Sequence, residues 1–189
     1  MEGSMKTLIL NGSPRKNGDT VSLIRLLTGQ LKGECRVVDV YFAAISPCRD
    51  CRFCWENDGC AIQDEMQEIY AYIQECDHIV IASPVYFSEL TGKMLDVCSR
   101  LQRFFCARVF RGENPVAKLK KGAVILVGGG DGKMDTAHKT ARILLRQMNC
   151  AEIHELVASH GTNQKPAICD EQAVRGIECI ADFFNHSEK

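Results

Sequence analysis

The sequence of 189 residues predicts an α/β fold: a doubly wound, five-stranded parallel sheet with helices on both faces. Short runs rich in Ile, Val and Leu alternate with longer stretches of helical periodicity. Strands that are covered on both faces of a parallel sheet have this apolar character. No Pro/Ser-rich linker or block of charge divides the chain, so residues 5–186 are expected to form a single domain.

Five strands are expected, each followed by a helix. The predicted strands are short, apolar and rich in β-branched residues: Lys6 to Asn11, Arg36 to Tyr41, His78 to Ser83, Ala123 to Gly128 and Ile153 to Ala158. The predicted helices between and after them are Thr20 to Leu31, Asp64 to Cys76, Glu89 to Arg103, Asp135 to Met148 and Asp170 to Phe184. Because ligands of such sheets bind beyond the carboxyl ends of the strands, functional residues are expected after the first, third and fourth strands.

The loop after the first strand, residues 11–20, has the chemistry of a phosphate-binding turn. It leads directly into a helix, whose first amides and dipole favour an anion. Hydrogen-bond donors, a cation and a glycine that allows close approach of the backbone lie within it: Ser13, Asn17, Thr20, Arg15 and Gly18. An ordinary strand-to-helix turn capped by Asp19 or Thr20 is the alternative. The glycine spacing of dinucleotide-binding folds and the Gly-Lys-Ser/Thr ending of nucleoside triphosphatases are both absent.

Two further loops follow the third and fourth strands and suit a planar ligand. In residues 83–88, a proline fixes the turn and aromatic side chains could stack on a ring; the candidates are Pro84, Val85, Tyr86 and Phe87. After the fourth strand, Gly128, Gly129 and Gly130 leave the backbone bare for close approach. Plugging of the core by the aromatics and a flexible glycine connector are the alternatives. Three such loops together favour a phosphorylated planar cofactor.

Four cysteines lie within thirteen residues, in the loop 47–60 that follows the second strand. The spacing of Cys48, Cys51, Cys54 and Cys60 is similar to a ligand set for a [4Fe-4S] cluster. Zinc, an empty thiol loop and disulfides are the alternatives. The remaining seven cysteines have no ligand spacing and are expected to be small core residues: Cys35, Cys76, Cys98, Cys106, Cys150, Cys169 and Cys179.

Charge and hydropathy limit the partners of the chain. The formal net charge is −1, and its lysines and arginines are mixed among acids, so neither a nucleic-acid-binding face nor a polybasic membrane anchor is expected. No signal-peptide pattern and no apolar run near the length of a membrane span is found in the sequence, and we expect a cytoplasmic protein with reduced thiols. Small molecules are the expected partners.

The three strand-end loops resemble the FMN loops of the NAD(P)H-dependent FMN reductase group, in the flavodoxin-like superfamily. The motifs that carry the resemblance are Gly12-Ser13-Pro14-Arg15 with Gly18 and Thr20, Ser83 to Phe87, and Gly128 to Gly130. Within that group, the cysteine loop resembles that of the iron-sulfur flavoproteins, whose members carry FMN and a [4Fe-4S] cluster and transfer electrons as homo-oligomers. The resemblance covers nearly the whole chain and implies the strand order 2-1-3-4-5.

The resemblance also implies a function. FMN would be held at its phosphate by Ser13, Arg15, Asn17 and Thr20 and at its isoalloxazine ring by Pro84 to Phe87. Electrons would pass from NAD(P)H, or from a reduced carrier such as ferredoxin, through FMN to a small-molecule acceptor, in a homodimer or homotetramer. No nucleophile–base pair is present, so no catalytic side chain is predicted. A non-enzymatic electron carrier and a flavodoxin-like module with a zinc or thiol loop are the alternatives.

Overall fold

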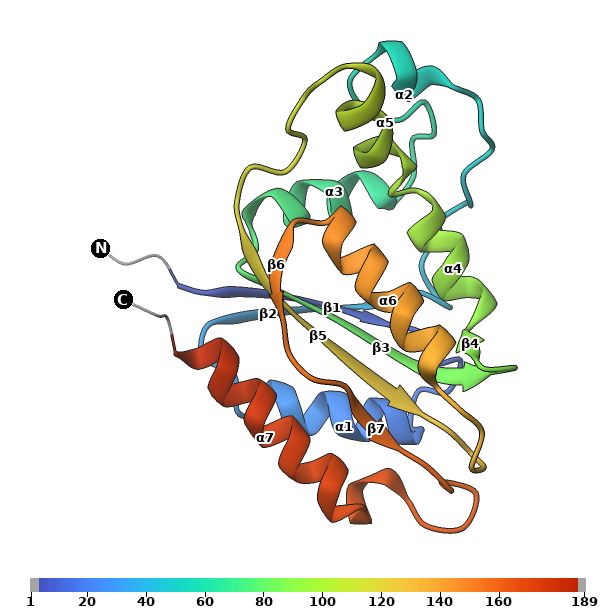
Figure 1. Ribbon diagram of the computed structural model, residues 1–189, viewed down its shortest axis with the longest axis vertical. Helices are drawn as coiled ribbons and strands as arrows, with labels where there is room; N and C mark the ends of the chain where they lie inside the picture. Colours follow the sequence, from blue (N-terminus) through green and yellow to red (C-terminus); the bar gives the residue numbers. More distant parts are fainter. Residues whose placement is uncertain (1–3, 187–189) are drawn as a thin grey trace.

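The computed structural model describes residues 4–186, which form a parallel sheet between two layers of helices (Figure 1). The strands are β1 (Lys6–Asn11), β2 (Glu34–Asp39), β3 (His78–Tyr86), β4 (Glu89–Leu90), β5 (Lys120–Val127), β6 (Cys150–Ile153) and β7 (Val157–Ser159). The sheet runs in the order β2-β1-β3-β5-β6, while β7 pairs with β5 and β4 with β3. The doubly wound α/β fold is therefore confirmed, with seven strands in place of five.

Helices cover both faces of the sheet. On one face lie α1 (Asp19–Thr28) and α7 (Glu171–Asn185), the latter preceded by a short 3-10 turn, Ala167–Cys169. On the other lie α3 (Met66–Glu75), α4 (Gly92–Ser99) and α6 (Asp135–Gln147). Two more helices, α2 (Phe53–Glu56) and α5 (Gln102–Phe110), lie together on the outer side of the layer that contains α3 and α4, at the top of Figure 1.

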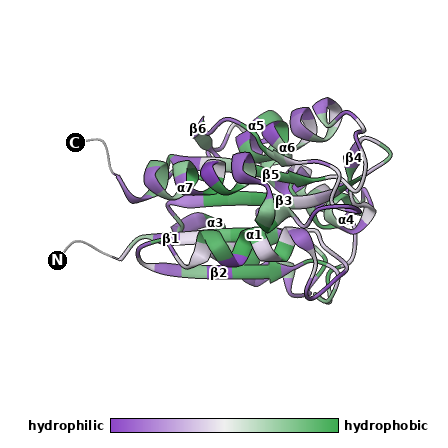
Figure 2. Ribbon diagram, turned by 90° about the horizontal axis from the view of Figure 1, so that it is seen from below, coloured by the Kyte–Doolittle hydropathy of each residue, from purple (hydrophilic) through white to green (hydrophobic). Residues whose placement is uncertain are grey.

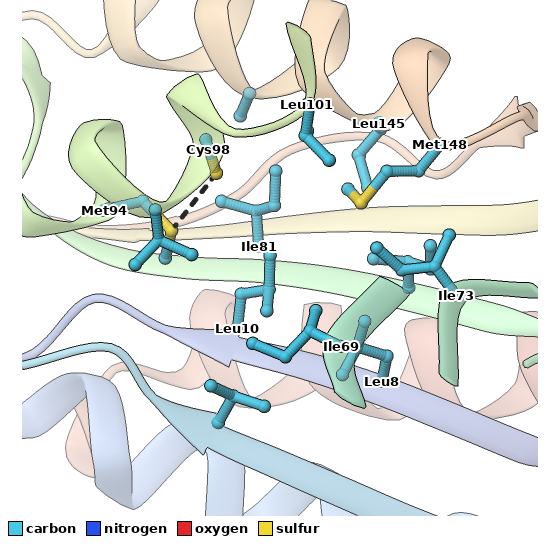
Figure 3. Close-up of a cluster of buried hydrophobic side chains, with 14 of the residues drawn as sticks. Leu8, Leu10, Ile69, Ile73, Ile81, Met94, Cys98, Leu101, Leu145 and Met148 are labelled. Atoms are coloured by element: carbon cyan, nitrogen blue, oxygen red, sulfur yellow. Dashed lines mark hydrogen bonds between the residues drawn. The ribbon is translucent and has the colours of Figure 1, made fainter. Parts of the chain in front are cut away.

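The alternation of side chains along each strand creates two separate cores. In β3, Ile79 and Ile81 join the core under α3, α4 and α6, while Val80 and Ala82 join the core under α1 and α7. The central strands are accordingly coloured as largely hydrophobic in Figure 2. Figure 3 shows the first core, in which Ile81 lies among side chains of the surrounding helices. Because every central strand is covered twice, its sequence is a continuous apolar run.

The prediction of a single helix over Glu89 to Arg103 is wrong. Its first two residues form β4, which folds back on the end of β3. Thr91 then adopts an extended conformation, with φ −61° and ψ 146°, before α4 begins. After Ser99 the chain tightens through hydrogen bonds from the Arg100 amide to Val97 and from the Leu101 amide to Cys98, and α5 follows as a second helix.

The predicted fifth strand, Ile153 to Ala158, is divided into β6 and β7. β6 pairs with the beginning of β5, where the register shifts between Lys120 and Lys121, and β7 pairs with the end of β5. The bounds of the other predicted elements differ from the observed ones by at most three residues. Within residues 4–186, no helix is long and apolar enough to cross a membrane.

Candidate functional site

Four loops meet in a cleft at the carboxyl edge of the sheet. The cleft has a volume of about 110 Å³. It is lined by the β1–α1 loop and the start of α1, by the ends of β3 and β5, and by the loops after β5 and β7: Ser13, Pro14, Arg15, Gly18, Asp19, Thr20, Pro84, Val85, Tyr86, Val127, Gly129, Thr162 and Asn163. This is the edge at which a doubly wound sheet binds its ligands. The cleft thus brings the three loops singled out in the sequence together.

The amino-terminus of α1 opens into this cleft without a side-chain cap. Gly18 is the N-cap residue in extended conformation, and it has no side chain that could cap the first amides of the helix. The carboxylate of Asp19 is turned to another partner, because its Oδ1 accepts from the amide of Ala167 at 2.8 Å. Uncapped first-turn amides and the helix dipole form a site for an anion.

The β1–α1 loop is held in place by its own polar side chains. The Asn11 Oδ1 atom accepts from the Ser13 amide at 3.0 Å, and the Asn11 Nδ2 atom donates to Asp39 at 2.7 Å. The Ser13 hydroxyl accepts from the Arg15 amide at 3.1 Å. These contacts fix the backbone of the loop, while the Arg15 side chain is exposed at the rim of the cleft.

The end of β3 forms the opposite wall. Val85 pairs with Leu90 and Tyr86 with Glu89, so the segment is held as an antiparallel hairpin that directs Pro84, Val85 and Tyr86 to the cleft. The Tyr86 side chain is 46% exposed. Phe87 lies at the tip of the hairpin in a left-handed conformation, with φ 53°, and is fully exposed. It does not line the cleft.

The fourth wall comes from a segment that the sequence analysis did not select. After β7, the amides of Gly161, Thr162 and Asn163 donate to the carbonyls of the glycine loop, residues 128–130, at 2.9–3.2 Å. A Cβ atom on Gly129 would lie 2.8 Å from the side-chain nitrogen and oxygen of Asn163. A larger residue at position 129 would therefore require the Asn163 side chain to move. The sequence contains a pattern that could have identified this segment, because residues 159–163 form a polar turn with a glycine directly after a strand.

Eight of the twelve residues predicted to bind a cofactor line the cleft: Ser13, Arg15, Gly18, Thr20, Pro84, Val85, Tyr86 and Gly129. The structure does not bring Asn17, Phe87, Gly128 or Gly130 to it. The Asn17 side chain accepts a hydrogen bond from Arg25 at 2.9 Å, and a Cβ atom on Gly128 would lie 2.8 Å from Met134. Asn17 and Gly128 thus contact neighbours outside the cleft.

The four cysteines of loop 47–60 line a second cavity, outside the sheet, with a volume of about 140 Å³. Its wall is completed by α5 and by aromatic side chains; Trp55 and Phe110 stack with their ring centres 4.2 Å apart. Burial and the neighbouring Cys106 thiol raise the pKa of the Cys54 thiol to about 11. We call this space the cysteine cavity.

Arg100 connects the two ends of the cysteine loop. Its side chain is 0% exposed, and it donates to the Ser46 carbonyl at 2.9 Å, to the Ile62 carbonyl at 3.1 Å and to the Asp64 carboxylate at 2.7 Å. Burial by itself raises the pKa of Asp64, but the hydrogen bonds from Arg100 and from two backbone amides outweigh it and hold that pKa below its usual value. The loop is therefore closed by a buried ion pair.

The helix α4 contacts both sites. At its beginning, the Thr91 hydroxyl donates to the carbonyl of Gly12, in the β1–α1 loop, at 2.9 Å. At its end, the Ser99 hydroxyl accepts from the amide of Cys48 at 2.9 Å, beside Arg100. A single helix thus positions one loop of the cleft and the first cysteine of the cysteine cavity.

Arginines surround the cysteine cavity. Arg100 and Arg103 line it, and Arg111 donates to the Cys54 carbonyl. Within residues 4–186, the Nε atoms of all three arginines are buried and have no hydrogen-bond partner. Unpaired buried donors are costly, and their number here points to an anionic group in or near the cavity.

The cysteine side chains do not form a ready metal site. In the part of the chain that the structure describes, no group of three or more His, Cys, Asp or Glu side chains is arranged to hold a metal ion. Of the seven cysteines expected in the core, Cys76, Cys98, Cys106 and Cys150 are buried and Cys35 is half-buried, but Cys169 and Cys179 are exposed. For the last two the expectation is wrong, because they lie on the outer side of the segment that carries α7.

Comparisons with known proteins agree with this geometry. Iron-sulfur flavoproteins of Archaeoglobus fulgidus and Methanosarcina thermophila are each 30% identical, over 68% and 66% of this chain. The chain spans only 57% and 64% of the lengths of these relatives. The NAD(P)H:quinone oxidoreductase from Methanothermobacter marburgensis has the same fold, with a TM-score of 0.70, 14% identity and coverage of 99% of this chain and 100% of that one.

The family itself is recognised over most of the sequence. Residues 5–164 match the NADPH-dependent FMN reductase family, and this range includes the loops after β1, β3, β5 and β7 as well as the cysteine loop. The chain therefore belongs to the NADPH-dependent FMN reductase family.

Proposed function

We propose that the chain is an FMN-dependent oxidoreductase that passes electrons from NAD(P)H, or from a reduced carrier, to a small-molecule acceptor. The observation that carries the proposal is the convergence of four strand-end loops and the uncapped start of α1 on one cleft. FMN, when bound, accepts a hydride from a nicotinamide and releases electrons singly or in pairs. The residues of the cleft bind and orient it.

The phosphate fits the end of the cleft formed by the β1–α1 loop. The uncapped amides of α1 and the hydroxyl of Thr20 are donors, and Arg15 supplies a positive charge at the rim. The Ser13 hydroxyl, which donates to the Arg15 carbonyl at 3.1 Å in this structure, could turn to the phosphate when it binds. Thr162 and Asn163 extend this polar set from the other side. The anion-binding chemistry of these residues fits the cofactor.

The flavin ring fits the end of the cleft formed by β3. Pro84, Val85 and Tyr86 present an apolar wall with an aromatic side chain, against which a planar heterocycle can lie. The hairpin with β4 holds this wall in position. Gly129 faces it from the β5 loop and leaves the backbone accessible.

We further propose that Cys48, Cys51, Cys54 and Cys60 hold a [4Fe-4S] cluster in the cysteine cavity. The names of the relatives support this assignment, and so does the donor set, since four thiols line one cavity beside buried arginines. A cluster gives each thiolate its own iron, whereas zinc gathers four ligands at one ion. The bound cluster would serve as a one-electron relay.

The cysteine cavity favours a second candidate function, a non-enzymatic electron carrier that receives electrons from a protein such as ferredoxin. We expect a homodimer or homotetramer in either case. Apolar side chains exposed around α5 and α6 support association of subunits: Phe105, Val109, Phe110 and Ile143. A cytoplasmic location stays a prediction from the sequence.

The first experiment is an ultraviolet-visible spectrum of the anaerobically purified protein, followed by steady-state oxidation of NADPH and NADH with an artificial acceptor. Flavin bands with nicotinamide oxidation are expected. Flavin bands without nicotinamide oxidation would favour the carrier, and a colourless protein that does not take up added FMN would contradict both. A broad absorption that dithionite bleaches would support the cluster, whereas stoichiometric zinc without sulfide would contradict it.

A further inference from the structure

The cysteine cavity contains a fifth thiol that the loop motif does not include. Cys106 belongs to α5 and is only 4% exposed, yet it lines the same cavity as the four loop cysteines. Cys106 is thus both buried and part of the cavity wall. Its position follows from the packing of α5 on the loop, which the spacing of cysteines in the sequence cannot reveal.

Several contacts hold Cys106 beside Cys54. The helix that carries Cys54, α2, packs on α5, and the stacked rings of Trp55 and Phe110 connect the two helices. Arg111, at the end of α5, donates to the carbonyl of Cys54. Cys54 and Cys106 line the same cavity, and the proximity of the Cys106 thiol contributes to the raised pKa of Cys54.

The loop cysteines are not equivalent to one another. Cys51 is exposed and lies between two residues in left-handed conformation, Asp50 and Arg52, with φ 48° and 60°. Cys60 interacts electrostatically with Tyr70 and Arg100, at the other end of the loop. Within residues 4–186, Cys54 is the loop cysteine whose pKa is raised by Cys106.

We propose that Cys106 is a reserve ligand of the cysteine cavity, able to take the place of Cys54 at the iron that Cys54 would bind. This inference rests on the proposed [4Fe-4S] occupant. In the replacement, the bond between Cys54 and the iron would break as the bond between Cys106 and the iron forms, and the thiol proton of Cys106 would pass to the Cys54 thiolate that leaves. Where Cys54 is absent, the proton would pass to water and a solvent ligand would leave the iron; no electrons are transferred in either case. The buried arginines around the cavity favour the thiolate that results.

The test compares four variants that are reconstituted anaerobically with Fe²⁺ and sulfide: Cys54→Ala, Cys106→Ala, the double variant, and Cys60→Ala as the matched control. The readout is iron and acid-labile sulfide per chain. Cys54→Ala and Cys106→Ala are expected to keep most of the wild-type content. The double variant and Cys60→Ala are expected to lose most of it. A Cys54→Ala protein as empty as the double variant would overturn the proposal.

Two further measurements distinguish a variant that does not fold, a chain that binds no cluster and a Cys106 that is not a reserve ligand. FMN content reports folding of each variant, and Cys54→Ser replaces Cys54→Ala if the latter does not fold. A wild-type chain that takes up neither iron nor sulfide would contradict the proposed cluster. The same variants titrated with Co²⁺ then test the shared thiol by itself, through thiolate-to-cobalt absorption. Stronger absorption in Cys54→Ala than in the double variant would support the reserve ligand, and equal absorption would overturn it.

Discussion

The cleft and the cysteine cavity are built in different ways. The cleft is formed largely by backbone at the ends of strands, and neighbouring strands of the sheet position its loops. The cysteine cavity lies outside the sheet, as Figure 1 shows for the elements around it. Its walls are a loop, two short helices and buried arginine side chains that pack against each other. The position of the cleft follows from the topology of the sheet, whereas the shape of the cysteine cavity depends on individual side chains. Substitutions should therefore destabilise the cavity region more than the cleft.

The largest effect is expected for Asp64→Ala. It leaves the guanidinium of Arg100, whose side chain is fully buried, without its charged partner. Breaking a buried ion pair in this way costs about 3–5 kcal/mol. The free energy of unfolding from urea denaturation measures the effect. Glu171→Ala is the control, because its pair with Arg175 is exposed and is expected to contribute less than about 0.5 kcal/mol. Equal losses in the two variants would contradict the role of the buried pair.

Arg15→Ala tests the cleft. The variant is expected to weaken FMN binding by about 1.5–3 kcal/mol, because a charge-assisted hydrogen bond to the phosphate is lost. Quenching of flavin fluorescence gives the dissociation constant. Lys16→Ala is the matched control: it removes the same charge from the next residue, which does not line the cleft. If FMN affinity is unchanged in Arg15→Ala, Arg15 is not part of the phosphate site.

The Asn163→Ala variant tests whether the loop after β7 contributes to FMN binding. Loss of one neutral hydrogen bond to FMN is expected to weaken binding by about 0.5–1.5 kcal/mol. Isothermal titration calorimetry resolves a change of this size. Gln164→Ala, at the adjacent exposed position outside the cleft, should bind FMN as the wild type does. If the two variants bind FMN with similar affinity, Asn163 does not contact FMN, and its role is limited to packing against Gly129.

The smallest expected effect is the dependence of stability on acidic pH. The pKa of Asp64 is held below its usual value, so its ion pair stabilises the folded protein at higher pH, and that stabilisation is lost as the pH falls below about 4. The difference in unfolding free energy between wild type and Asp64→Asn should accordingly shrink in this range. Thermal unfolding at a series of pH values checks it. A difference that stays constant down to pH 3 would mean that the pKa of Asp64 is the same in the folded and the unfolded protein.

The same contrast explains what could be predicted from the sequence. The bounds of β1 were predicted without error, and the cleft was found from its loops, because a doubly covered strand is a continuous apolar run with a polar turn at its end. The helix predicted over Glu89 to Arg103 failed because Thr91 is bound to Gly12, a contact that local periodicity does not contain. Cys106 is buried as expected, but its place in the wall of the cysteine cavity could not be predicted, since nothing in its neighbourhood along the chain relates it to the loop 47–60.

The two ends of α4 give the molecule a fixed spacing between its sites. Thr91 is tied to the β1–α1 loop and Ser99 to Cys48, and eight residues of helix at 1.5 Å each separate these anchors by about 12 Å. A helix is stiff along its axis, so the separation is insensitive to thermal motion in either loop. If electrons move between the two sites, α4 sets the distance between their anchors. A deletion within it should then change the rate of transfer, because each residue removed shortens the helix by about 1.5 Å and rotates its end by about 100°.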